Sequence, residues 1–164
     1  MIRLLLTSDD VDIFRRIRLE ALREEPNAFA RTAAQWEALS EEEWKDRMTH
    51  NPVFVAFNGP EPVGPMGYMR QGADKMAHRA TLVMVYLRKD RRCGGFAGAM
   101  LAALMTHARE TGIRQMELAV SAENPAAVRF YEREGFVPFG RIPCGFLQDG
   151  REVDEILMAK RTEA

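Results

Sequence analysis

Residues 91–98, with the sequence RRCGGFAG, form the stretch that decides the fold. Shortly before it, residues 80–87 (ATLVMVYL) are apolar and rich in β-branched side chains, which predicts a buried strand. After it, small and apolar residues recur at helical spacing from Ala97 to Ala108, and Gly112 is suited to end that helix. The chain is therefore expected to run from a strand through a glycine-rich turn into a helix.

Such a turn collects backbone N–H groups at the positive end of a helix, where they favour an anion such as a phosphate. Gly94, Gly95 and Ala97 carry little bulk, so the oxygens of a ligand can approach the main chain. Arg91 and Arg92 add positive charge. A glycine-rich turn with two solvated arginines explains the same residues without a ligand. Because no Gly-Lys-Ser/Thr follows and the G-x-G-x-x-G register is missing, a nucleotide triphosphatase and a dinucleotide-binding fold are disfavoured.

A second motif follows an alternating strand at residues 116–120. It is NPAAVRFYEREGF at residues 124–136. Together with Arg92-x-x-Gly95-x-Ala97, it resembles the GNAT superfamily of N-acetyltransferases, whose pyrophosphate loop the first motif is similar to. Both motifs stand in the family's order and are joined by one helix and one strand. The resemblance is strong across residues 80–136, about a third of the chain, and generic elsewhere.

The resemblance implies one acetyl-CoA-dependent N-acetyltransferase domain over residues 1–164, a length that can bury one full core. The expected fold class is α+β, with a mixed, mostly antiparallel central sheet and helices on both faces. Two central strands splay apart in that family, and the pantetheine arm of the cofactor lies in the gap. Here those strands would be residues 80–87 and 115–120.

By the same resemblance, acetyl-CoA donates the acetyl group to a primary amine, which attacks directly in a ternary complex. The backbone of Val85, Tyr86 and Leu87 would bind the pantetheine arm and polarise the acetyl carbonyl. Asn124 would contact the cofactor, and it is also a natural helix cap with Pro125 behind it. The residues implied to cradle the pyrophosphate are Arg92, Cys93, Gly94, Gly95, Phe96 and Ala97.

Tyr131 and Glu117 are the candidate catalytic residues. Tyr131 lies two turns after Asn124 on the same helix face; a core tyrosine explains it too, but the resemblance implies the general acid for the departing thiolate. Some relatives carry a glutamate at the position of Ala119, so a direct base is in doubt. Glu117 lies on the same strand face about 7 Å away and could act through a water. A solvated or salt-bridged carboxylate is an equal alternative.

The missing carboxylate at Ala119 keeps a rival function open, namely a non-catalytic module that senses acyl-CoA. The amine acceptor, small molecule or peptide, is not specified by the sequence. Asp154 and Glu155 are candidates for holding a cationic acceptor. The acidic run at residues 41–43 is better explained as the start of a helix, where negative charge is favourable.

The composition argues against several classes of binding partner. Lys and Arg number 23 against 24 Asp and Glu, so no broad basic field predicts nucleic-acid binding. The two cysteines lack metal-ligand spacing, so no metal site is expected. The longest apolar run, residues 96–105, is too short for a membrane span, and no export signal follows Met1, so a cytoplasmic protein is expected. Exposed strands after Phe136 would permit a homodimer.

Outside the motifs, periodicity predicts the remaining elements. A short strand at residues 2–6 leads into a helix, residues 27–39 are ambiguous, and Ser40-x-x-Glu43 is a capping box. Trp36 and Trp44 are expected in the core. The remaining predicted strands are residues 53–57 and 63–70, joined as a hairpin, and residues 136–146 and 153–159.

Overall fold

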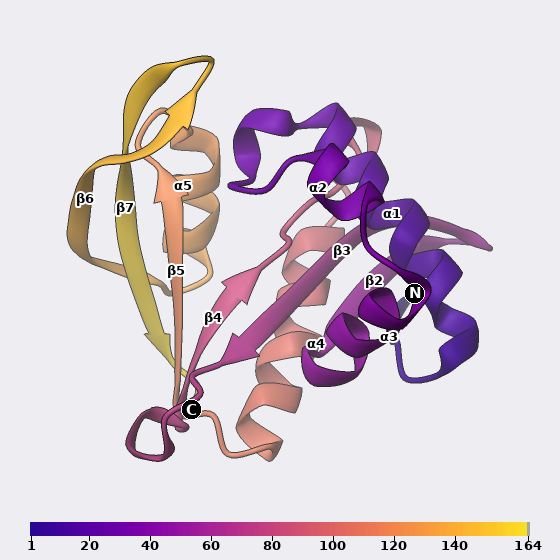
Figure 1. Cartoon of the computed structure of the whole chain (residues 1–164). Helices are drawn as coiled ribbons and strands as arrows, with labels where there is room; N and C mark the ends of the chain where they lie inside the picture. The colour runs from indigo at the N-terminus through magenta and orange to yellow at the C-terminus, as the bar shows by residue number, and fades with distance from the viewer. Residues whose placement is uncertain (164) are drawn as a thin grey trace.

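The computed structural model describes residues 1–163 and has an α+β architecture (Figure 1). Seven strands form one sheet in the order β1-β2-β3-β4-β5-β7-β6, and every neighbouring pair is antiparallel except β4 and β5. The predicted mostly antiparallel mixed sheet is therefore confirmed. The helices are α1 (Val11–Glu24), α2 (Ala33–Glu37), α3 (Glu41–His50), α4 (Phe96–Glu110) and α5 (Pro125–Arg133), and the strands are β1 (Ile2–Leu4), β2 (Val53–Asn58), β3 (Glu61–Arg70), β4 (Arg79–Val83), β5 (Gln115–Ser121), β6 (Val137–Gln148) and β7 (Arg151–Arg161).

Two apolar clusters hold the layers together. One lies between the sheet and the helices α4 and α5, and includes Met100, Leu104 and Tyr131. The other joins α1, α2 and α3 to β2 and to the segment after β4, and includes the predicted core residues Trp36 and Trp44, 5% and 1% exposed. Because each face of the sheet is covered by its own helices, the sheet is buried along its centre.

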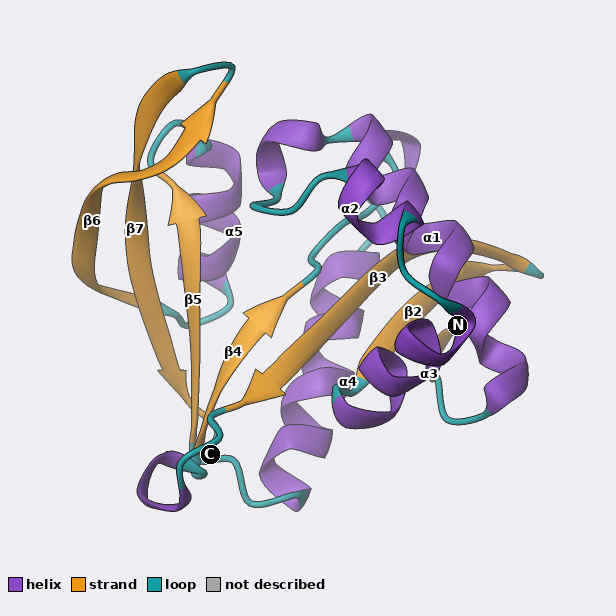
Figure 2. Ribbon diagram, viewed as in Figure 1, coloured by secondary structure: helices purple, strands orange, loops and turns teal. Residues whose placement is uncertain are grey.

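The central strands β4 and β5 pair over only three residues, from Arg79 opposite Gln115 to Thr81 opposite Glu117. Beyond that point they diverge, and Figure 2 shows their arrowheads well apart. β5 keeps its antiparallel partner β7 along its whole length. The gap therefore opens on the side of β5 that faces β4, as expected from the resemblance.

The predicted strand at residues 80–87 is wrong in its second half. β4 ends at Val83, because Met84 takes a left-handed backbone conformation with φ 58°. After Met84 the chain returns to β3 with its partners shifted by one residue, as a β-bulge requires. Gly64 makes this possible: a Cβ there would lie 2.3 Å from the Tyr86 carbonyl oxygen.

Local capping signals are confirmed. The Ser40 hydroxyl accepts the Glu43 N–H at 3.2 Å, and the Glu43 carboxylate accepts the Ser40 N–H at 2.7 Å. At the far edge of the sheet, β6 leaves Val137, Phe139 and Leu147 exposed, and a homodimer through this edge stays a prediction. Within residues 1–163, none of the helices combines the length and the apolar character needed to cross a bilayer.

Candidate active site

The N-terminus of α4 is built from backbone rather than from side chains. Gly95 precedes the helix in the left-handed region, with φ 77°, and no side chain caps the first turn. The first N–H groups of a helix have no partner within it, so several donors are left at this end. A Cβ placed on Gly95 would meet no atom within 4 Å, so space lies beside the turn. The arrangement suits an anion that accepts from backbone N–H groups.

The cations around this turn are all paired. Arg88 binds Glu20 through two hydrogen bonds of 2.6 and 2.7 Å, and Arg92 binds Glu25 at 2.7 Å. Glu25 also lies 3.9 Å from Lys89. Arg91 contacts its neighbour Asp90 at 3.2 Å. Each cation of residues 88–92 therefore has a carboxylate within reach; Glu20 of α1 and Glu25 directly after that helix serve three of the four.

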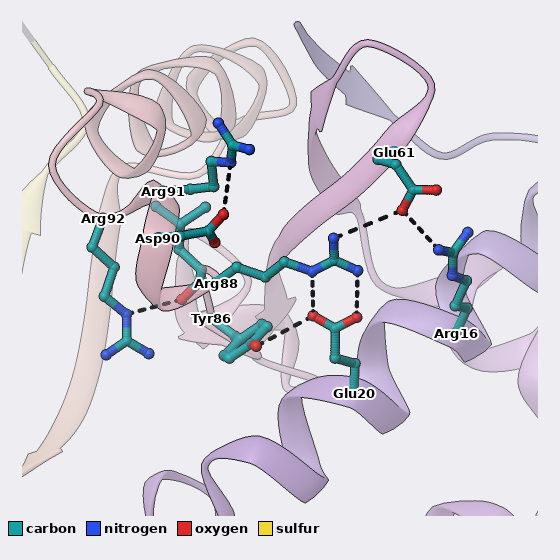
Figure 3. A network of polar contacts seen from close by, with 9 residues as sticks. Arg16, Glu20, Glu61, Tyr86, Arg88, Asp90, Arg91 and Arg92 are labelled. Carbon is teal, nitrogen blue, oxygen red and sulfur yellow. Dashed lines mark hydrogen bonds and ion pairs between the residues drawn. The ribbon is translucent and has the colours of Figure 1, made fainter.

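The Glu20–Arg88 pair is the centre of a wider network (Figure 3). Tyr86 donates its hydroxyl hydrogen bond to Glu20 at 3.3 Å, and Glu61 joins Arg88 to Arg16. Arg88 lowers the pKa of the Glu20 carboxyl through its hydrogen bonds, and Glu20 raises that of Arg88. Burial, and then Glu20, raises the pKa of Tyr86 to about 12. An open cavity of about 440 Å³ borders the network and is lined by Glu20, Glu24, Arg88, Lys89 and Asp90.

The segment between the bulge and the turn presents backbone groups to the gap. The Tyr86 N–H donates to the Pro65 carbonyl at 3.1 Å, and the Arg88 N–H donates to Val63 at 2.9 Å. Successive residues of an extended chain direct their backbone groups to opposite sides. Val85 and Leu87 therefore direct theirs away from β3, and the Leu87 carbonyl accepts a hydrogen bond from Arg92 Nε at 2.9 Å.

Helix α5 follows β5 and carries Asn124 and Tyr131. Asn124 is the N-cap, and its side-chain oxygen accepts the Ala127 N–H at 3.2 Å, with Pro125 in the first turn. Tyr131 is 7% exposed and packs edge-to-face on Phe136. Its hydroxyl makes no hydrogen bond with any described residue, and burial raises its pKa well above the ordinary range. The phenol is therefore held protonated.

Glu117 is not a free carboxylate. Arg79 binds both of its oxygens, at 2.5 and 2.8 Å, and Gln115 donates to one of them at 2.8 Å. Hydrogen bonds from Arg79 lower the pKa of the Glu117 carboxyl, which makes it a weaker base. Of the two alternatives raised by the sequence, the salt-bridged carboxylate is the one observed. Ala119, next on the same face, is exposed.

The two acceptor candidates on β7 are also engaged or crowded. Asp154 binds Arg141 at 2.7 Å and accepts the Cys144 N–H at 2.9 Å, and these contacts lower its pKa. Glu155 lies against Gly145, where a Cβ would approach its carboxylate to 2.8 Å. Asp154 is therefore already paired with a cation, whereas Glu155 has no ion pair with any described residue.

The ion pairs of Glu20, Glu25 and Arg79 were not predicted from the sequence. Each pairs with a residue 38 or more positions away along the chain, so only the folded structure brings the partners together. One signal in the sequence could have suggested these pairs: the basic run at residues 88–92 needs acidic partners, and Glu20 and Glu25 are carboxylates on and directly after the first helix. Among residues 1–163, no group of three or more metal-ligating side chains comes together.

Comparison with known proteins gives a consistent family. The model of the acetyltransferase (GNAT) family matches residues 18–136. The L-methionine sulfoximine/L-methionine sulfone acetyltransferase of Pseudomonas aeruginosa is 28% identical over 142 residues, which cover 80% of this chain and 81% of that protein. The mycothiol acetyltransferase of Actinosynnema mirum is 27% identical over 127 residues, 77% of this chain. The chain spans only 41% of that second relative.

Solved structures agree on the fold. Ribosomal-protein-alanine N-acetyltransferase from Brucella melitensis superposes with a TM-score of 0.80 at 26% identity, covering 98% of this chain and 99% of that one. The yncA protein of Salmonella typhimurium, solved with its cofactor acetyl-CoA, gives a TM-score of 0.82 at 18% identity, covering 100% and 94%. Both likenesses extend over almost the entire sheet and its helices.

Proposed function

This chain belongs to the GNAT family of acetyltransferases, and on that premise we propose that it moves an acetyl group from acetyl-CoA to a primary amine by direct attack in a ternary complex. The family's reaction is acetyl-CoA-dependent acetyl transfer. Its curated relatives are named as acetyltransferases, so the sensor alternative is not favoured.

The proposed donor site has two backbone parts. The N-terminus of α4, opened by Gly95, would receive the pyrophosphate on N–H groups that have no other partner. Val85 and Leu87 would bind the pantetheine arm and polarise the acetyl carbonyl, since their backbone groups face the gap. The support for both parts is that, among the described residues, the Val85 and Leu87 N–H groups have no hydrogen-bond partner, and that a Cβ at Gly95 would meet no atom within 4 Å. The Leu87 carbonyl is already bound by Arg92.

Tyr131 is the proposed general acid. The amine lone pair forms a bond to the acetyl carbon, the carbon–sulfur bond breaks, and the Tyr131 hydroxyl gives its proton to the departing sulfur. The one observation that carries this role is a buried phenol whose hydroxyl has no hydrogen-bond partner among the described residues. Such a phenol stays protonated at neutral pH and has its donor unused.

Deprotonation of the amine is assigned to solvent. Ala119 offers no base, and Glu117 is occupied by Arg79. The acceptor therefore reacts as the fraction already present as free amine. The rate at low acceptor concentration should rise with pH until the acceptor's own pKa is reached.

The test is an amine panel. Release of coenzyme A thiol is followed with L-methionine sulfone, L-methionine sulfoximine and an alanine-initiated peptide, chosen because the relatives are named for such acceptors. We expect amine-dependent thiol release and an N-acetyl product by mass spectrometry. Acetyl-CoA binding without turnover on any primary amine would restore the sensor function, and no binding at all would reject the proposal.

A further inference from the structure

Arg92 uses its side chain to close the turn on itself. Its Nε donates to the Leu87 carbonyl at 2.9 Å, five residues back, and its Nη2 donates to Glu25 at 2.7 Å. One guanidinium thus ties three points together: the end of the bulged segment, the start of the glycine turn and the end of α1. Such a fork fixes the relative position of its partners.

Glu25 is well placed to hold this fork. It is the C-cap residue directly after α1, its N–H donates to the Ala21 carbonyl at 3.0 Å, and Pro26 follows it. Proline restricts the backbone of the residue before it, so the carboxylate starts from a fixed point. Its side chain is 29% exposed, and Lys89 at 3.9 Å is a second cation beside it.

Five residues earlier, on α1, Glu20 binds Arg88 through two hydrogen bonds. Figure 3 shows the Glu20 carboxylate facing the Arg88 guanidinium with two parallel contacts. Glu20 on α1 and Glu25 directly after it therefore bind the two ends of residues 88–92. Arg91 lies between them, and its one ion pair among the described residues is with Asp90, its neighbour in the chain.

The pairing changes what Arg92 can do for a phosphate. A guanidinium beside a carboxylate presents little net charge to a third group, since the two charges largely cancel. Apart from the Nη1 group of Arg92, the unpaired donors among the described residues of this turn are the backbone N–H groups at the start of α4. Arg92 therefore contributes to phosphate binding by fixing the geometry of the turn and not by its charge.

We propose that Arg92 and Glu25 are a positioning pair that holds the phosphate-binding turn in its binding geometry, and that Arg92 is not itself a principal phosphate ligand. This inference rests on the proposed function, because it concerns the affinity for acetyl-CoA. It also assigns α1, which contributes nothing to either sequence motif, a role in the donor site.

A double-mutant cycle tests the pair. Acetyl-CoA affinity is measured by titration calorimetry for the unsubstituted chain, Glu25→Gln, Arg92→Gln and the double variant. A positioning pair predicts that each single change weakens binding by about five- to tenfold, a range typical of coupled pairs. The double variant should bind acetyl-CoA about as tightly as the weaker-binding of the two single variants, because both changes break the same contact. With acetyl-CoA saturating, kcat should stay within about threefold, because the reacting atoms are untouched.

A direct phosphate ligand predicts the opposite pattern. Glu25→Gln would then leave the acetyl-CoA affinity unchanged or improve it, since a negative charge is removed. The fold-changes in affinity of the two single variants would then multiply in the double variant. Arg92→Lys sharpens the choice: it keeps the charge but cannot make both contacts, so we expect it to bind as weakly as Arg92→Gln. Retained affinity in Arg92→Lys would overturn the proposal.

Glu24→Gln is the matched control. Glu24 is the last residue of α1 and makes no ion pair with any other described residue, so the same loss of charge should change affinity by less than about twofold. If the unsubstituted chain fails to bind acetyl-CoA, the proposed function and the positioning pair are both rejected. If it binds and the cycle is multiplicative, only the positioning pair is rejected.

Discussion

Helices α4 and α5 follow the two diverging strands, yet they begin in opposite ways. α4 begins at Gly95, a left-handed residue with no capping side chain, and leaves its first N–H groups unpaired. α5 begins at Asn124, whose side chain takes one of those N–H groups, and Pro125 removes another. One helix start is open to an anion and the other is closed by its own residues.

The difference teaches how each helix contributes to one site. An open helix start can act through its backbone, so its side chains must be small enough to allow approach. A capped start cannot hold an anion on the same donors, so α5 has to act through a side chain further along. Tyr131, buried on α5 with a free hydroxyl, is the side chain that fits. Substitutions at each helix can separate binding through backbone N–H groups on α4 from catalysis through a side chain on α5.

Tyr131→Phe is expected to have the largest effect. The change removes one hydroxyl and keeps the ring, so packing against Phe136 survives. We expect kcat to fall by about 10²–10⁴-fold, because the thiolate must leave without an acid. Acetyl-CoA affinity and melting temperature should change little. A folded variant with normal kcat on a confirmed acceptor would remove Tyr131 from the mechanism, and a lower melting temperature with normal kcat would make it a core residue only.

Gly95→Glu tests the backbone mode of α4. A carboxylate at this turn meets phosphates with like charge, which costs several kcal/mol, so the acetyl-CoA dissociation constant should rise by at least about 10²-fold. Gly112→Glu is the matched control, because Gly112 lies just past the other end of α4 with φ 88° and equal free space. Both variants carry the same backbone strain. Equal affinity in the two variants would show that the start of α4 is not the cradle.

Local rules predicted much of this molecule. The Ser40–Glu43 capping box, the Asn124 cap and the order of strand, turn and helix all depend on residues within a few positions of one another. The bulge at Met84 was missed because methionine inside an apolar run carries no turn signal. The Glu25–Arg92 contact was missed because 67 positions separate the partners.

Arg18 shows a further limit of pattern reading. An arginine on an amphipathic helix is expected at the surface. Arg18 is instead 4% exposed and stacks on Phe29 and Trp36, at 4.6 and 4.7 Å from the ring centroids. Burial and nearby Arg47 lower its pKa to about 10, which still leaves it charged at neutral pH. Only the packing of α1 against α2 reveals this, since helical periodicity cannot distinguish a buried cation from a solvated one.

Asn124→Ala tests the closed start of α5. Loss of the contact to Ala127 leaves one N–H without a partner, so the free energy of unfolding should fall by about 1 kcal/mol. Asn124→Ser restores a capping oxygen and should recover most of this loss. Acetyl-CoA affinity, measured on both variants, then shows whether Asn124 also contacts the cofactor: a loss of affinity in the serine variant despite recovered stability would assign that second role.

Glu117→Gln should have the smallest effect on turnover, within about twofold, because a carboxylate already bound at both oxygens by Arg79 has little capacity to accept a proton. The substitution should instead change the free energy of unfolding. Hydrogen bonds from Arg79 lower the pKa of the Glu117 carboxyl in the folded state, so its contribution is present above the unfolded pKa of about 4.3 and is lost as pH falls through the lowered value. Denaturant unfolding at pH 7 and below pH 4 should therefore show a smaller loss on acidification for the variant than for the unsubstituted chain. A fall in kcat of about 10²-fold at full stability would instead make Glu117 the base, and strand β5, rather than solvent, the acceptor of the amine proton.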